Sequence, residues 1–178
     1  MKFLTTLFTF GLAIGALAEP IPKPKRQVDA YKEVLYSIVD QIAIVDTLIT
    51  AYVNGQVPGD DVQAASDELV AVINDGATTI TGLPPLSVLD VLGLVGEITD
   101  IIDDTSGVVD NLIAAEPTFA ADGLDDDVLA GLLGLEAASE NLRTAIVPKV
   151  PSALQGLADS LAAQVTAELQ RAIDAYSD

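Results

Sequence analysis

Few side chains in this sequence are of a type and spacing that could do chemistry, and the most suggestive are isolated hydroxyls. The sequence has no His and no Cys, which excludes Ser-His-Asp triads, thiolate nucleophiles, disulfides and zinc sites of imidazole or thiolate. Ser66, Thr99 and Ser139 interrupt rows of aliphatic residues at helical spacing. Each hydroxyl either hydrogen-bonds the head group of a ligand or bonds back to a carbonyl one helical turn earlier.

Clustered carboxylates are the second kind of candidate. Segment 122–127 is rich in Asp, but it lacks the alternating oxygen ligands and the terminal bidentate Glu of a calcium-binding loop. Asp100, Asp103 and Asp104 fit one solvated helix face. A glycosidase needs a carboxylate pair held across a rigid gap and usually aromatic stacking, and only 4% of the residues are aromatic. We therefore expect no catalytic residues, no metal and no cofactor.

The net charge narrows the range of partners. The 178 residues include 27 acidic and 8 basic side chains, a formal charge of −19, which disfavours nucleic acids and anionic membranes. Without residues 1–26, which carry four of the basic and one of the acidic side chains, the charge is −22. The cations that remain, Lys32, Arg143, Lys149 and Arg171, either meet a ligand carboxylate or pair with surface acids.

The first 26 residues are typical of targeting and processing segments. Residues 1–18 have a basic start, an apolar run too short to span a bilayer, and small residues at the end, which predicts a secretory signal peptide. Residues 19–26 contain three prolines and end in Lys25-Arg26, which indicates a propeptide with a dibasic cleavage site. The polar tail 172–178 does not fit a glycolipid anchor. We expect one domain over 27–178 that is secreted, extracellular or in the cell wall.

The elements that must position the hydroxyls are helices. Apolar residues from Val28 to Tyr52 alternate at intervals of three and four, the period of an amphipathic helix, and no strand pattern follows. The predicted fold is all-α, an antiparallel bundle of about five amphipathic helices with an aliphatic core. We expect the helices at about 28–53, 60–82, 88–116, 125–147 and 152–176, a kink or break near 105–107, a loop over 117–124, and caps at Ser87 and Ser152.

The composition of the core raises the prospect of a cavity. The apolar rows are almost wholly Leu, Ile, Val and Ala, so few large rigid groups are available to fill the bundle axis. The rows are compatible with a slot for an extended acyl chain and with a densely packed core. The residues that would line such a slot are, helix by helix, Leu35, Ile38, Ile42 and Val45; Ser66 and Leu69; Val95, Thr99 and Ile102; Leu135, Ser139 and Leu142; and Leu157, Leu161 and Val165.

The whole arrangement resembles a known family. The signal peptide, the Lys25-Arg26 site, the amphipathic opening over 28–48, the turn over 83–87 and the segment 149–151 before the last helix are similar to the fungal hydrophobic surface-binding protein A family, also called cell-wall galactomannoproteins. This resemblance implies a secreted helical bundle that adsorbs to hydrophobic surfaces, helps to recruit polyester-degrading enzymes to them, and in some members encloses a fatty acid or another lipid.

Two functions follow from these observations. The first is a secreted, non-catalytic carrier that holds a fatty acid or another lipid between its helices, because buried methylenes bind with little polar help. The second is a surface-active adhesion protein that opens, lays its apolar faces on wax, cuticle or polyester, and recruits a secreted polyester hydrolase. The two differ in whether the bundle stays closed.

Overall fold

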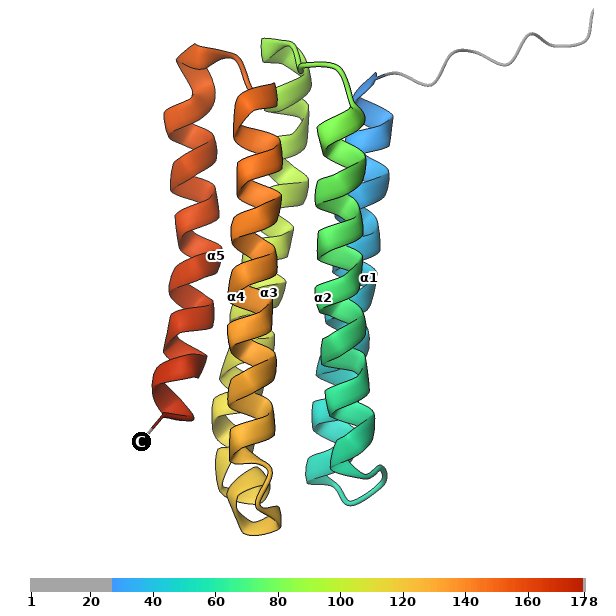
Figure 1. Ribbon diagram of the computed structural model, residues 1–178, viewed down its shortest axis with the longest axis vertical. Helices are drawn as coiled ribbons and strands as arrows, with labels where there is room; N and C mark the ends of the chain where they lie inside the picture. The colour runs from blue at the N-terminus through green and yellow to red at the C-terminus, as the bar shows by residue number, and fades with distance from the viewer. Residues whose placement is uncertain (1–26, 178) are drawn as a thin grey trace, which may run out of the picture.

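The computed structural model describes residues 27–177, and within them it contains helices and no strand. The elements are α1 (Gln27–Val53), α2 (Gly59–Gly82), α3 (Val88–Asp122), α4 (Asp125–Ile146), the short 3-10 helices η1 (Val147–Lys149) and η2 (Ser152–Leu154), and α5 (Gln155–Ala175). The predicted all-α antiparallel bundle of five helices is confirmed (Figure 1). The predicted signal peptide (1–18) and propeptide (19–26) lie outside the described residues.

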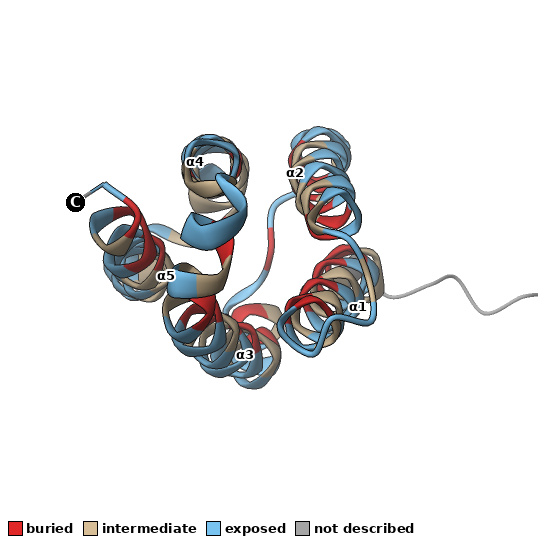
Figure 2. Cartoon of the chain, turned by 90° about the horizontal axis from the view of Figure 1, so that it is seen from below, coloured by how far each residue is buried: buried red, intermediate tan, exposed pale blue. Residues whose placement is uncertain are grey.

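The five helices form a ring rather than a solid stack. The chain runs down α1, up α2, down α3, up α4 and down α5 (Figure 1). Around the ring, α1 packs against α2 and α3, α2 packs against α4, and α5 closes the circle between α4 and α3. The end-on view shows that the buried residues of each helix face the centre of this ring (Figure 2). The ring therefore has an axis that side chains from all five helices must fill.

Helix α1 shows why the sequence folds in this way. By length and composition its span Val28–Val53 is apolar enough to cross a membrane, but here it is a core helix with one buried face. The main row of buried residues recurs at intervals of three and four, as the sequence predicts, and Val34 is buried beside it; the row is Tyr31, Leu35, Ile38, Ile42, Val45, Ile49 and Tyr52. Burial of this row against α2 and α3 stabilises the helix far more than its intrinsic propensity does.

Helix α3 corrects two predictions. It is unbroken from Val88 to Asp122, so no break occurs near 105–107 and the expected loop over 117–124 is largely helical. Pro117 lies inside the helix, where it forgoes one backbone hydrogen bond. The helix continues because Phe119 is 1% exposed and stacks on Tyr52 with ring centroids 4.3 Å apart. Gly123 then ends it in the left-handed conformation, at a φ of 71°.

Of the two predicted caps, one is confirmed and one is wrong. Ser87 and Asp90 form a capping box at the start of α3, as is typical of a helix that begins after a turn. At the other site, Ser152 belongs to η2 and makes no capping hydrogen bond. The Gln155 amide instead donates to the carbonyl oxygens of Val147 and Val150, at 3.3 and 3.2 Å, which ties α5 to the preceding turn rather than to its own first turn.

A candidate ligand-binding cavity in the ring of helices

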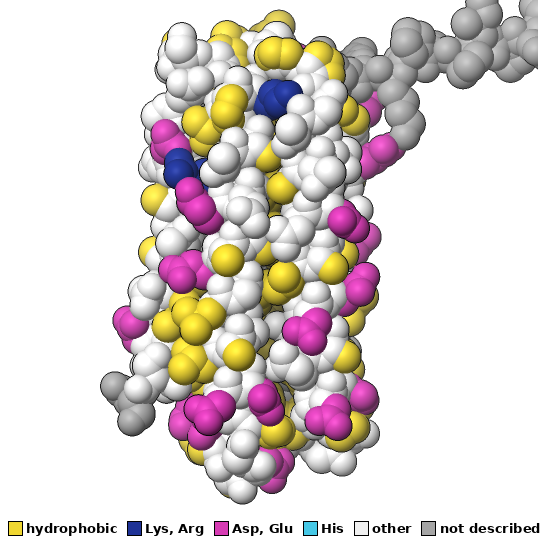
Figure 3. Space-filling view, viewed as in Figure 1, with side chains coloured by type: hydrophobic (Ala, Val, Ile, Leu, Met, Phe, Trp, Pro, Cys, Tyr) yellow, Lys and Arg dark blue, Asp and Glu magenta, His cyan; other side chains and the backbone are white. Residues whose placement is uncertain are grey.

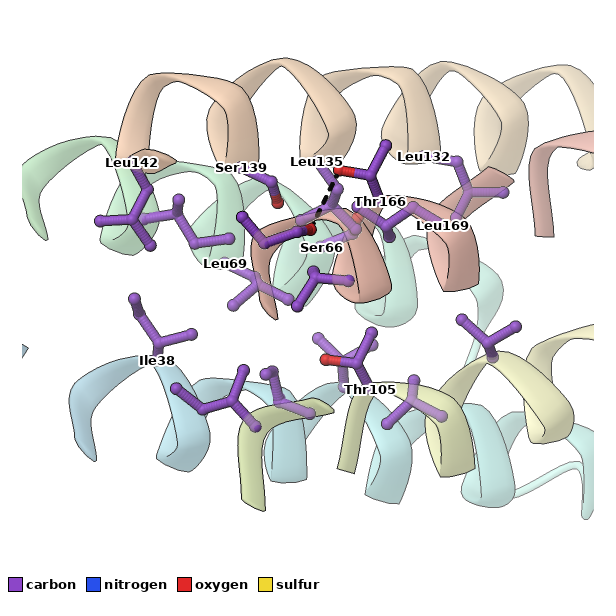
Figure 4. Close-up of a pocket in the computed structure, with 18 of the residues that line it drawn as sticks. Ile38, Ser66, Leu69, Thr105, Leu132, Leu135, Ser139, Leu142, Thr166 and Leu169 are labelled. Carbon is purple, nitrogen blue, oxygen red and sulfur yellow. Dashed lines mark hydrogen bonds between the residues drawn. The ribbon is translucent and has the colours of Figure 1, made fainter. Parts of the chain in front are cut away.

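The axis of the ring contains a cavity of about 200 Å³. All five helices contribute to its lining, and most of the lining side chains are Leu, Ile and Val (Figure 4). No Asp or Glu lines it. The described part of the chain therefore surrounds an apolar space that is partly open to solvent, which favours a slot over a densely packed core.

Most of the residues predicted to line the slot do line this cavity. They are Leu35, Ile38, Ile42, Val45, Ser66, Leu69, Leu135, Ser139, Leu142, Leu161 and Val165. They come together because each lies on the buried or half-buried face of its helix. Val95 and Leu157 instead line a smaller cavity of about 40 Å³, which shares Leu161 and four other residues with the main one.

Thr99 and Ile102 line neither cavity, which corrects their predicted place. The Thr99 hydroxyl is exposed and donates to the backbone carbonyl oxygen of Val95 at 2.8 Å. The predicted row of α3 is displaced by one residue from the row that faces the axis, which runs through Ile98, Ile101 and Thr105. One residue turns a helix by about 100°, and the wide apolar surface of α3 made both rows plausible from the sequence.

Further lining residues were not predicted from the sequence. They are Ile49, Val62, Gln63, Ile73, Ile98, Ile101, Thr105, Val108, Val109, Leu112, Phe119, Val128, Leu132, Arg143, Ile146, Val147, Ala158, Ala162, Thr166 and Leu169. Most are aliphatic residues of the same stripes. Thr105 could have been found from spacing, because it lies four residues from Ile101 and four from Val109, both of which are buried.

Three hydroxyl groups in the cavity wall have no hydrogen-bond partner within residues 27–177: those of Ser66, Thr105 and Ser139. Thr105 is the most enclosed of them, at 9% exposure, and Figure 4 shows it on the opposite wall from Ser66 and Ser139. The exposed Thr166, by contrast, donates to the carbonyl oxygen of Ala162 at 3.3 Å. Ser66 and Ser139 are half-buried and Thr105 is buried, so these hydroxyls have hydrogen-bonding capacity that a ligand in the cavity could use.

The Ser66 hydroxyl owes its position to a close approach between α2 and α4. A Cβ atom built at Gly131 would lie 3.1 Å from Ser66 Oγ, which is a tight contact. Any residue larger than glycine at this position would therefore press against the Ser66 hydroxyl. Gly131 is itself buried. Glycine at this position therefore allows the two helices to pack with the Ser66 hydroxyl between them.

Arg143 lines the cavity, but its guanidinium group is already paired. Its Nε and one terminal nitrogen donate to the Glu140 carboxylate at 2.8 and 2.7 Å, and the other terminal nitrogen donates to Asp159 at 2.8 Å. These bonds raise the pKa of Arg143 and lower that of Glu140. The cation thus links α4 to α5 and leaves no free positive charge in the wall.

The other cations of the described chain are also occupied. Lys32 pairs with Glu97, which holds the pKa of that carboxyl below its ordinary value, and Arg171 pairs with Asp110 and Glu168. Lys149 donates to backbone carbonyl oxygens at the end of α2. Among residues 27–177 no cluster of three or more acidic side chains is arranged to hold a metal ion. The cavity therefore offers burial and neutral hydrogen bonds.

Comparison with known proteins places this cavity in context. The chain is 36% identical over 178 residues to cell wall mannoprotein 1 of Aspergillus fumigatus, and it spans 61% of that protein's length. Ligand binding domain 1 of the Penicillium marneffei MP1 protein, complexed with arachidonic acids, superposes with a TM-score of 0.82 at 27% identity, over 86% of this chain and 100% of the domain. AFMP4P, solved with palmitic acid, shares the fold at 17% identity, with a TM-score of 0.78 over 84% and 99% of the two chains.

A family model extends the comparison over most of the helical ring. The model for hydrophobic surface binding protein A matches residues 28–148, from the start of α1 into η1. This match confirms the resemblance inferred from the sequence. The chain belongs to the hydrophobic surface binding protein A family.

Proposed function

We propose that this protein binds a fatty acid, or another lipid with one extended acyl chain, inside the ring of helices. The observation that carries the proposal is the apolar cavity, whose wall contains hydroxyl groups without protein partners. On α1 the lining runs from Leu35 to Ile49, about 21 Å at 1.5 Å per residue, long enough for an extended long-chain acyl group. The arachidonic acids in the similar MP1 domain support this ligand class.

The binding energy would come mainly from the acyl chain. Burial of about ten methylenes contributes about 8 kcal/mol, and the cost of association reduces the net affinity from that value. Because Arg143 is paired with Glu140 and Asp159, a ligand carboxylate would meet hydroxyls rather than a free cation. We therefore expect the protein to accept neutral head groups as well as carboxylates.

We further propose that the protein is secreted and acts without catalysis. The lining residues include no acid, and the chain has no His or Cys, so the cavity has no general base or ordinary nucleophile beyond unactivated hydroxyls. A location outside the cell or in the cell wall is supported by the similarity to cell wall mannoproteins. Recruitment of a secreted polyester hydrolase stays a prediction from the family resemblance.

Two neighbouring alanines of α5 provide a matched test of ligand binding. Ala162 lines the cavity, whereas Ala163 is exposed. In Ala162→Phe the ring should occupy acyl-chain space, so delipidated protein should bind arachidonic acid at least about tenfold more weakly in native mass spectrometry and in fluorescence titration. Ala163→Phe should bind like the wild type. Equal binding by both variants, or an absence of binding by the wild type, would refute the proposal.

A further inference from the structure

The wall of the main cavity is not equally buried on all sides. The lining residues of α1, within 35–49, are all buried. On α5 the lining residues within 158–165 are only half-buried and Thr166 is exposed, and on α4 those within 139–146 are half-buried. Because the same cavity leaves the α1 residues buried, the exposure on α4 and α5 indicates that the cavity opens to solvent between these two helices.

Helix α5 therefore has two unlike borders. We call its border with α4 the α4–α5 seam and its border with α3 the α3–α5 seam; the end-on view shows α5 between these two helices (Figure 2). On α3 most of the lining residues within 101–112 are buried. Figure 3 looks onto the side of α4 and α5 and shows apolar side chains between the acidic ones over both helices. The α4–α5 seam is thus the more open of the two.

Both ends of α5 are tied to the bundle, but its middle is not. The Gln155 amide bonds to the turn over 147–150. At the other end the Tyr176 hydroxyl donates to the carbonyl oxygen of Leu112 on α3 at 2.8 Å, and no residue within 155–168 is buried between these two ties. A helix moves most easily where it buries least apolar surface, so the middle of α5 is the part that separates from α4 at the lowest cost.

One ion pair crosses each seam. Arg143 of α4 donates to Asp159 of α5 at 2.8 Å, and Arg171 of α5 donates to Asp110 of α3 at 2.6 Å. All four side chains are at least 38% exposed, so each pair holds its seam only weakly. Arg143 lines the cavity, whereas Arg171 and Asp110 do not. The pair of Arg143 and Asp159 therefore lies across the opening of the cavity.

We propose that lipid enters and leaves the cavity sideways, through the α4–α5 seam, and that the pair of Arg143 and Asp159 is the latch of this entrance. The inference rests on the proposed lipid binding and adds the route to the site and its control. Because the latch closes the seam in the same way with and without ligand, it sets the rates of binding and release and leaves the Kd unchanged.

Two matched substitutions test the latch. Asp159→Asn removes the pair across the α4–α5 seam, and Asp110→Asn removes the pair across the α3–α5 seam. In each variant the arginine keeps the glutamate on its own helix, Glu140 for Arg143 and Glu168 for Arg171. The probe is cis-parinaric acid, a fluorescent fatty acid, and stopped-flow fluorescence measures its binding to delipidated protein and its release into excess arachidonic acid.

We expect Asp159→Asn to bind and release the probe about two- to fivefold faster than the wild type with an equal Kd, which is the range for an exposed ion pair. Asp110→Asn should behave like the wild type. Added salt should accelerate the wild type towards the rates of Asp159→Asn, because salt screens the pair. Unchanged rates in Asp159→Asn, or equal acceleration in both variants, would overturn the latch.

A cross-link tests the route itself. The chain has no Cys, so Arg143→Cys with Asp159→Cys can be joined by a short bismaleimide across the α4–α5 seam, and Asp110→Cys with Arg171→Cys across the α3–α5 seam. Each protein is compared with itself before and after linking.

We expect the link across the α4–α5 seam to slow release of the probe at least about tenfold, and the link across the α3–α5 seam to leave it unchanged. Equal slowing by both links, slowing by the α3–α5 link alone, or no slowing by either would overturn the route while leaving the proposed lipid binding intact. A wild type that binds no fatty acid would refute lipid binding itself, and the entrance with it.

Discussion

The hydroxyl of Thr105 allows the sharpest test of the site, because two measurements should respond to its removal in different directions. Thr105 is 9% exposed, lines the cavity and makes no side-chain hydrogen bond within residues 27–177. Thr105→Val replaces the hydroxyl with a methyl group of similar shape and keeps a β-branched residue with similar helix propensity. The change therefore tests the hydrogen bond rather than the packing.

In the ligand-free protein the substitution should be harmless or stabilising. It removes a buried polar group that has no protein partner, so the free energy of unfolding should stay the same or rise by up to about 1 kcal/mol. For a domain of this size that is an increase in the melting temperature of up to about 2–4 °C. Thermal unfolding of delipidated protein, followed by circular dichroism, measures this effect.

Ligand binding should weaken in the same variant. A neutral hydrogen bond contributes about 0.5–1.5 kcal/mol, so the Kd for arachidonic acid should rise about two- to tenfold. Thr99→Val is the control on the same helix, because its hydroxyl is exposed and bonds back to Val95, and its Kd should equal that of the wild type. An unchanged Kd in Thr105→Val would show that the hydroxyl does not meet the ligand. A loss of more than about 1 kcal/mol of stability would show that it has a structural partner.

Two further predictions concern stability. Leu132 is 3% exposed and lines the cavity, so Leu132→Ala should lower the free energy of unfolding by about 2–5 kcal/mol in urea titrations; a loss below about 1 kcal/mol would mean that this wall is not packed as described. Burial, together with the hydrogen bond to Asp122, raises the pKa of Tyr52 to about 12 from an ordinary value of 10.0. The folded state therefore favours the neutral phenol, and this contribution to stability is intact below pH 10 and declines as the pH rises towards about 12. Thermal unfolding of the wild type and Tyr52→Phe across this alkaline range should show a shallower decline in the variant, and parallel curves would contradict the reasoning.

The helices could be predicted because their signal is local and repeated. The alternation of three and four along α1 and the Ser87 cap both follow from the residues in one turn and the next. The end of α3 could not be predicted in this way. Pro117 signals a stop, and only the packing of Phe119 against Tyr52, 67 positions away along the chain, explains why the helix continues.

The candidate site was predictable in character but not in detail. Rows of aliphatic residues indicate which helix faces are buried, and on four of the helices most of the predicted residues do face the axis. On α3 the apolar surface is wide enough for two rows, and the neighbours of the helix select the one that contains Thr105 over the one that contains Thr99. The packing of a helix against its neighbours determines which of its apolar rows faces the axis of the ring. The local spacing of apolar residues does not specify this choice when the apolar surface is wide.

The amino-acid sequence by itself determined that this chain is acidic, helical, aliphatic in its core and without His or Cys chemistry, because each of these properties is a sum over residue types or a short-range period. Only the tertiary structure decided that the helices close into a ring with a cavity and that three hydroxyls face it without partners. These features depend on contacts between residues far apart in the chain, and such contacts exist only once the helices have packed.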